Sequence, residues 1–301
     1  MTRDSLKDLA WFDQWVAFDQ QTIAEALTVR KGAVRNKQYE PQFVYRLSTR
    51  YFELMLRRYS RGDALRELAP YFGPMLDAWE EAERLGKSIW TGEDQAMRHS
   101  WKSNLDFYIG CFWRVGIAMA LEVPDSQWQR LVRLIGNEGE DAMLDRVIAT
   151  RHPGRSIGTQ LCHPMPYRRL LEAIEAPAPD RPALLKSFVT HWYAELDRLP
   201  KKGLSRETAI YDRPHWYGYH DVQGAYFGYW CIEAVAVAKA FGIDDHSCLG
   251  LPHYPGDLLR ADGPSTHKEM TPASQREAVD AVTIKPTLGD RVRKVLFAPK
   301  A

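Results

Sequence analysis

Histidine is the residue type whose distribution most suggests chemistry in this chain of 301 residues. Two segments, "PHWYGYHD" at 214–221 and "GLPHYPGD" at 250–257, combine imidazoles with Asp221 and Asp257, groups that bind metals or transfer protons. No HExxH motif, no histidine pair at helical i, i+4 spacing and no nearby second cysteine accompanies them. We therefore expect histidines that satisfy loop backbone groups, with no metal and no cofactor. The histidines after residue 150 are His152, His163, His191, His215, His220, His246, His253 and His267.

Motifs for nucleophilic catalysis and phosphate binding are also missing. The chain has no G-x-S-x-G and no glycine-rich phosphate loop. "STHK" at 265–268 spells S-x-x-K, but it lies in a polar tail where nothing would lower the pKa of the lysine. We expect no catalytic residues.

Glu233 is the most unusual carboxylate, because it lies in the middle of the apolar run "GAYFGYWCIEAVAVAKAFG" at 224–242. An unpaired charge would not be tolerated in an apolar interior. Arg114, the lone charge in the middle of a second apolar run, is one candidate partner, and a tyrosine or histidine from the aromatic loop is the other. Either reading makes Glu233 a structural carboxylate.

Two acidic clusters are candidates for contact with a basic partner. "DAWEEAERLG" contains Asp77, Glu80, Glu81 and Glu83, and "NEGEDAMLD" contains Glu138, Glu140, Asp141 and Asp145. Each is either a solvated helix face or a surface that steers a basic protein.

The overall composition excludes several classes of function. Forty basic and thirty-nine acidic residues leave no net field that would attract nucleic acid or a membrane. No run reaches the roughly 18 apolar residues that span a bilayer, and the start "MTRDSLKDLAW" does not resemble a signal peptide. The four cysteines form no CxxC pair and predict reduced thiols. These features predict a cytoplasmic protein.

Helices must position these residues. Apolar residues recur at three, four or seven in segments 6–27 and 43–58, and no segment shows sustained period-two alternation. Residues 94–122 predict one long helix, and Ser126 with Gln129 predicts a capping box that starts a helix running to about 150.

The two nearly apolar helices can be laid over each other at an offset of 120 residues, which places Cys111 on Cys231 and Val115 on Val235. This predicts an all-α multi-helix bundle of two helical halves, each around a central apolar helix. We expect an N-terminal helical domain at 1–125, a C-terminal helical domain at 126–262, and a polar, mildly basic tail at 263–301.

Several stretches resemble the PoNe-immunity (PoNi) family, which is all-helical and has N-terminal and C-terminal family domains. The N-terminal likeness is "RRYSRGDALRELAPYFGPMLDAWEEA". The C-terminal likeness runs through "NEGEDAMLDRVIA", "PYRRLLEAIEA", "FVTHWYAEL", "HDVQGAYFGYWCIEAVAVAKAFGIDD" and "YPGDLL". Cys231 departs from the small residue expected there, and the tail after 262 has no recognised motif. The positions assigned to the structural family core are Tyr226, Gly228, Tyr229, Trp230, Glu233, Arg114, Tyr254 and Pro255.

The resemblance implies an immunity protein that binds a secreted antibacterial DNase of the PD-(D/E)xK superfamily, delivered for example by type VI secretion, and neutralises it without catalysis. Occlusion of the DNA-binding groove by an acidic face is the expected mechanism, with the 138–145 cluster as the first candidate and the 77–83 cluster as the second. The alternatives are a helical metal-dependent hydrolase that uses His215, His220, Asp221, His253 and Glu233, and a helical scaffold or regulator. The oligomeric state stays open.

Overall fold

The computed structural model describes residues 2–32, 36–198, 213–222 and 224–267. Within these ranges every regular element is helical, which confirms the predicted all-α fold. Most of the predicted tail, from residue 268 onward, lies outside the described residues. The α-helices are α1 (Leu9–Arg30), α2 (Glu40–Arg61), α3 (Phe72–Gly86), α4 (Gly92–His99), α5 (Leu105–Ala120), α6 (Asp125–Ile135), α7 (Leu144–Ala149), α8 (Pro164–Glu175), α9 (Arg181–Glu195) and α11 (Ile232–Phe241).

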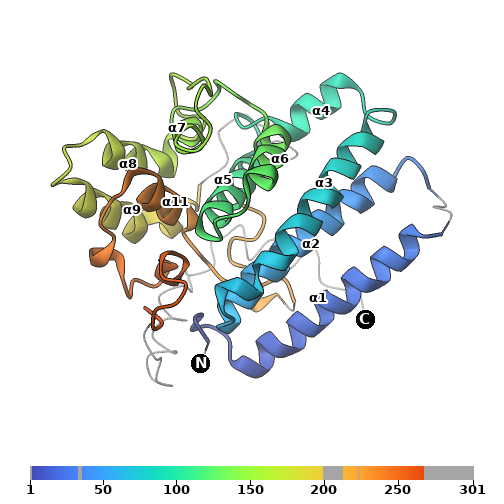
Figure 1. The fold of residues 1–301 in the computed structure, drawn as a ribbon, viewed down its shortest axis with the longest axis horizontal. Coiled ribbons are helices and arrows are strands. Elements are labelled where there is room, and N and C mark those ends of the chain that lie inside the picture. Colours follow the sequence, from blue (N-terminus) through green and yellow to red (C-terminus); the bar gives the residue numbers. More distant parts are fainter. Residues whose placement is uncertain (1, 33–35, 199–212, 223, 268–301) are drawn as a thin grey trace, which may run out of the picture.

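The first three helices lie side by side at one end of the molecule (Figure 1). α2 is in the middle, and α1 and α3 pack against it. Phe12, Val16 and Ile23 form the buried stripe of α1, and the Asp8 side chain caps this helix by accepting a hydrogen bond from the Trp11 backbone N–H. This end of the fold therefore follows from the helical periodicity of the sequence.

Two apolar helices, α5 and α11, pack directly on each other at the centre (Figure 1). Fourteen of the 16 residues of α5 and seven of the 10 residues of α11 are buried, so both helices are covered on nearly every side. They approach closely at Gly116, where a Cβ atom would lie 2.6 Å from Ile232 Cγ2. The absence of a side chain at Gly116 thus sets the distance between the two helices.

The predicted long helix over 94–122 is wrong. α4 ends at His99 and α5 begins at Leu105, and Asn104 caps α5 by accepting from the Phe107 backbone N–H. The local capping signal overrides the apolar periodicity that runs on either side of it.

The predicted capping box of Ser126 and Gln129 is also wrong. α6 begins at Asp125 after Pro124, so Ser126 already lies in the first turn. The helix ends at Gly136, which has a φ of +58°, and α7 is a separate short helix after an irregular segment.

None of the described helices is long and apolar enough to cross a membrane.

Candidate functional site

The first predicted acidic face, at 138–145, is only partly at the surface. Asp141 and Asp145 are fully buried, whereas Glu138 is exposed and Glu140 is half-buried. The prediction that all four carboxylates contact a partner is therefore wrong for Asp141 and Asp145.

The two buried aspartates organise the segment between α6 and α7. Asp141 accepts from the Tyr108 hydroxyl at 3.0 Å and from the backbone N–H groups of Met143, Leu144 and Cys162. This set of donors explains why a carboxylate is retained in a buried loop.

Asp145 is held in the same way. It forms an ion pair with Arg155 at 2.7 Å, and it accepts from the backbone N–H groups of Gly139, Asp141 and Gly158. Burial raises the pKa of Asp145, while these hydrogen bonds and the arginine oppose that effect. No sequence signal distinguished these aspartates from the exposed glutamates beside them.

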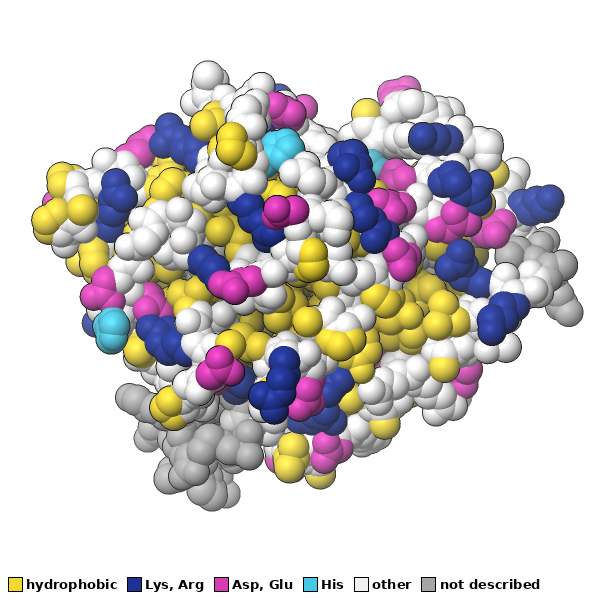
Figure 2. Space-filling model, viewed as in Figure 1, with side chains coloured by type: hydrophobic (Ala, Val, Ile, Leu, Met, Phe, Trp, Pro, Cys, Tyr) yellow, Lys and Arg dark blue, Asp and Glu magenta, His cyan; other side chains and the backbone are white. Residues whose placement is uncertain are grey.

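In the second predicted acidic cluster, at 77–83, Asp77 is exposed and the three glutamates are half-buried, and most of these carboxylates are paired with bases. Arg130 of α6 contacts Asp77 at 2.5 Å and Glu80 at 2.7 Å, and Arg84 contacts Glu81. On the face that contains α3 and α6, acidic and basic side chains are interspersed, without a continuous acidic patch (Figure 2). α3 thus presents a mixed surface.

The surface members of both clusters lie on either side of one segment, residues 99–102. His99 contacts Glu83 at 3.2 Å, and Lys102 approaches Glu140 at 3.9 Å. The backbone of His99 also accepts a hydrogen bond from Asn137, next to Glu138. Glu83 and Glu138, 55 positions apart in the sequence, therefore lie in one region around the C-terminal end of α4.

Glu233 is fully buried, and its partners are aromatic residues of α8 and α9. Its Oε1 atom accepts from the Tyr167 hydroxyl at 2.8 Å and from the Trp192 indole at 3.2 Å, whereas Oε2 has no hydrogen-bond partner among the described residues. Burial raises the pKa of Glu233 to about 7, against the opposing hydrogen bonds from Tyr167 and Trp192.

Arg114 is not the partner of Glu233. Its guanidinium lies over the ring of Phe52 at 4.4 Å and over that of Trp79 at 5.2 Å, and Nη1 donates to the Gly110 carbonyl at 2.9 Å. No ion pair among the described residues involves Arg114, which is 5% exposed. The hypothesis of a buried Arg114–Glu233 pair is therefore wrong, because the two side chains contact different sets of aromatic residues.

Arg114 lies on the wall of a cavity of about 650 Å³ between α2, α4 and α5. We call it the α2–α5 pocket. Thr49 of α2, Met97 of α4 and Gly110 of α5 belong to its lining. Its aromatic lining includes Phe52, Trp90, Phe107, Trp113, Trp216 and Phe227. The volume is in the range of known ligand pockets, and the wall combines aromatic side chains with polar and charged groups.

The residues of the predicted hydrolase site do not converge. His253 Nδ1 contacts the Tyr229 carbonyl at 3.0 Å, and burial lowers the pKa of His253 to about 4. His215 instead contacts Asp106 at 3.0 Å. His220 contacts the Tyr229 hydroxyl at 3.1 Å, and the side chain of Asp221 lies outside the described part of the chain.

Within the part of the chain that the structure describes, one group of residues has the spacing of metal ligands: Asp244, Asp245 and His246. Asp245 is already paired with Arg260 and accepts from the Tyr254 hydroxyl at 2.7 Å. An arginine competes with a cation for this carboxylate, so the group does not resemble a dedicated metal site.

The two sequence segments with the clearest family character meet at a junction between the C-terminal end of α2 and residues 224–230. Ser60 Oγ donates to the Phe227 carbonyl at 2.7 Å, and the Trp230 indole donates to Ser60 Oγ at 2.8 Å. Gly228 has a φ of +104°, and a Cβ atom there would lie 2.4 Å from Ser60 Oγ. The glycine therefore permits both the turn and the contact.

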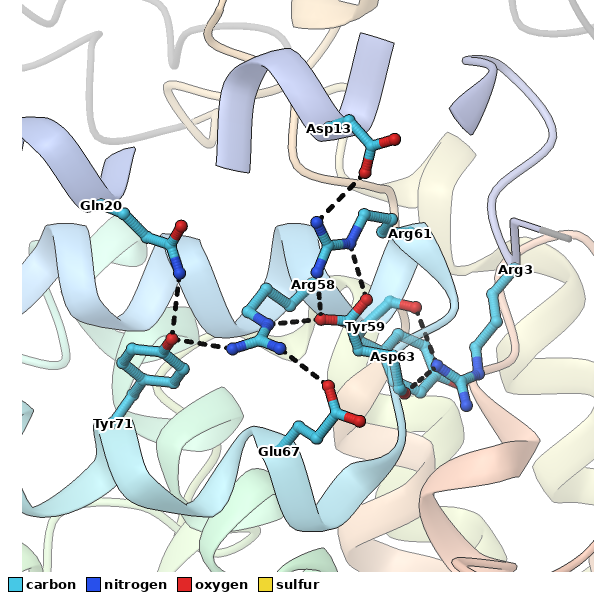
Figure 3. Close-up of polar contacts among 9 residues, drawn as sticks. All are labelled: Arg3, Asp13, Gln20, Arg58, Tyr59, Arg61, Asp63, Glu67 and Tyr71. Carbon is cyan, nitrogen blue, oxygen red and sulfur yellow. Dashed lines mark hydrogen bonds and ion pairs between the residues drawn. The ribbon is translucent and has the colours of Figure 1, made fainter. Parts of the chain in front are cut away.

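A network of ion pairs surrounds this junction (Figure 3). Asp63 pairs with both Arg58 and Arg61. Burial raises the pKa of Asp63, yet the hydrogen bonds from Arg61 and Arg58 hold it below its usual value. Arg3 donates to the Asp63 and Tyr59 carbonyls and pairs with Asp257 at 2.6 Å, which ties the N-terminal segment to both sides of the junction.

All residues assigned to the structural family core lie in the interior. Tyr226 donates to Asp4, and Tyr254 donates to Asp245. Sequence reasoning gave no indication that Asp4, Ser60 and Asp245 are the partners of Tyr226, Trp230 and Tyr254, which lie up to 222 positions away along the chain. The buried set is Tyr226, Gly228, Tyr229, Trp230, Glu233, Arg114, Tyr254 and Pro255.

Comparison with known proteins gives a consistent result over nearly the whole chain. Residues 3–133 match the family described as PoNe immunity protein (PoNi), N-terminal, and residues 139–258 match the family described as PoNe immunity proteins (PoNi), C-terminal. The crystal structure of protein PA2201 from Pseudomonas aeruginosa is similar, with a TM-score of 0.61 and 20% sequence identity, over 86% of this chain and 90% of that chain. This structural likeness shows a shared fold. No curated protein matches the chain.

Proposed function

The chain belongs to the PoNe immunity protein (PoNi) family, and from this premise we propose that it binds one cognate DNase toxin in the cytoplasm and blocks access of DNA to it. The observation that carries the proposal is the match of both family regions, which together cover residues 3–133 and 139–258. Proteins of this family are immunity proteins against polymorphic toxins and not enzymes.

The region around the C-terminal end of α4 is the best candidate for contact with a nuclease. It brings together Glu83, Glu138 and Glu140, and Glu93 and Asp94 of α4 are exposed close by in the chain. A DNase carries basic residues that bind phosphates, so carboxylates at this region would compete with DNA for them. Asp77, Glu80 and Glu81 contribute less to this competition, because nearby arginines of the same chain already pair with them.

Co-expression tests the proposed function. The open reading frame beside the gene is expressed in a bacterial host with and without this protein, and host survival and chromosomal DNA integrity are scored. Degraded DNA that the protein prevents supports immunity to a nuclease. A toxic neighbour that kills equally in both hosts would refute it.

The carboxylate assignment has a separate test. Reversal of Glu138 and Glu140 to lysine is expected to lower toxin affinity by roughly tenfold and to slow association at low salt. Reversal of Glu172 and Glu175 on α8, remote in sequence from this region, is the matched control. Equal affinities for both double variants would refute the assignment.

A further inference from the structure

The strongest unexplained feature is the Arg114 guanidinium in the wall of the α2–α5 pocket. Its only hydrogen bond to a described residue runs from Nη1 to the Gly110 carbonyl, and its Nε atom is buried without a partner. A buried guanidinium without a carboxylate is costly, by several kcal/mol in typical cases. The family match does not account for it, since the contacts that hold the two halves together lie elsewhere.

The Arg114 guanidinium lies in the pocket lining, close to the ring of Phe52 and to the backbone of Gly110. Gly110 precedes Arg114 by one helical turn, and a Cβ atom at Gly110 would come within 3.0 Å of Nη1. Phe52 supports the guanidinium from the opposite wall. Aromatic walls lower the local dielectric, which strengthens the attraction of Arg114 for an anion.

The acidic groups of the lining do not neutralise Arg114. Asp106 accepts from the backbone N–H of His215 at 2.9 Å and from its ring at 3.0 Å. Glu53 and Asp94 also line the pocket. Asp94 accepts from the Thr91 hydroxyl at 2.7 Å, and none of the three carboxylates forms an ion pair with Arg114. The ligand that best satisfies a free guanidinium is a carboxylate, which accepts from two of its nitrogens.

We propose that the α2–α5 pocket is an anchor site for the toxin, and that it receives an apolar side chain of the toxin next to a carboxylate that pairs with Arg114. The inference rests on the proposed function. It commits to the toxin because the mouth of the pocket includes Met97, Arg98 and His99, the part of α4 that adjoins the acidic region described above. A central apolar pocket with a polar surround is the usual form of an interface hot spot.

Three variants test the anchor by calorimetric titration with the purified product of the adjacent open reading frame, carrying an active-site mutation so that it can be produced. Thr49→Trp fills the pocket, Met97→Glu places a negative charge at its mouth, and Arg114→Met removes the cation with little change in volume. Each is expected to weaken binding by roughly 30-fold or more. Val29→Glu is the control for Met97→Glu, because it also replaces an exposed apolar helix residue by glutamate, but on α1. It should bind as the wild type does.

Stability separates an anchor from a structural role for Arg114. Arg114→Met should unfold at the same or a higher temperature than the wild type, because it replaces an unpaired buried charge by an apolar group, and should nevertheless lose affinity. Normal affinity in the pocket variants would overturn the anchor and leave the proposed function intact. No binding by the wild type itself would overturn both.

A small acid is the alternative occupant, and 3-phenylpropionate is a suitable probe. As a fragment of the proposed anchor it should bind at millimolar concentration and compete with the toxin. Tight binding that leaves the toxin affinity unchanged would identify a small-molecule site and overturn the anchor.

Discussion

Glu233 is a fully buried carboxylate whose charge state changes near neutral pH. Two aromatic donors satisfy one of its oxygens, and burial raises its pKa from the ordinary 4.5 to about 7. Between these two values the native state binds more protons than the unfolded state. The contribution of Glu233 to the free energy of unfolding therefore decreases as the pH rises from 4.5 to 7, and stays level above that range.

Glu233→Gln removes this titration. As the pH rises from 4.5 to 8, the free energy of unfolding of the variant is expected to increase by about 3 kcal/mol relative to that of the wild type. Urea unfolding of both proteins at pH 5, 6.5 and 8 measures the difference, and other titrating groups cancel because both proteins contain them. A difference that does not change with pH would contradict the assigned pKa.

Gly228 makes a second prediction at the residue scale. Gly228→Ala forces a side chain into a conformation with φ of +104° and against Ser60 Oγ, so the free energy of unfolding should fall by roughly 2–4 kcal/mol. Gly92→Ala is the control, since no atom lies within 4 Å of the added Cβ and the residue begins α4. Thermal unfolding of both variants measures the contrast, and equal melting temperatures would be evidence against the junction geometry.

The sequence identified the special residues better than it identified their contacts. Glu233 stands out because it interrupts an apolar run, but its partners Tyr167 and Trp192 come from helices 66 and 41 residues earlier. Asp141 and Asp145 look like their exposed neighbours in sequence, since what distinguishes them is the set of backbone donors that the loop assembles. Such partners depend on tertiary packing, which local periodicity does not contain.

At the scale of elements, the crossing of α5 and α11 determines how closely the two halves approach. Gly116→Ala gains up to about 1 kcal/mol of helix propensity but places a methyl group 2.6 Å from Ile232 Cγ2. Overpacking of this kind costs roughly 1–3 kcal/mol, so a net loss of stability is expected.

A double-mutant cycle tests the cause of that loss. Ile232→Ala creates space at the same contact. The double variant should therefore lose less free energy of unfolding than the two single variants lose together, by about 1 kcal/mol or more. Chemical denaturation of the four proteins gives the coupling energy. Strict additivity would mean that the two residues do not limit the helix crossing.

Periodicity predicted the helices and the central pair, whereas local capping determined where helices stop. The interruption between α4 and α5 depends on Asn104, and the end of α6 depends on Gly136. Each of these two residues interrupts a helical spacing of apolar residues that continues on both sides of it, so the spacing alone predicts one continuous helix. The α2–α5 pocket lies beside one of these interruptions, and this explains why it could not be predicted from local periodicity.

At the scale of the whole molecule, the two family regions share one interior. α5, from the N-terminal region, packs on α11, from the C-terminal region, and Ser60 bonds to both Phe227 and Trp230. We expect a single cooperative unfolding transition, with far-ultraviolet circular dichroism and tryptophan fluorescence coinciding during urea denaturation. Two separated transitions would indicate that the regions at 1–125 and 126–262 fold as independent domains.

The central claim is that this protein inhibits a DNase by binding to it. The most direct measurement is DNA cleavage by the purified product of the adjacent open reading frame, titrated with this protein and with its Met97→Glu variant. We predict that cleavage falls to zero at a fixed molar ratio to the wild type and that the variant needs a large excess. Undiminished cleavage at a large excess of wild type, with DNA and toxin below the protein concentration, would contradict the claim.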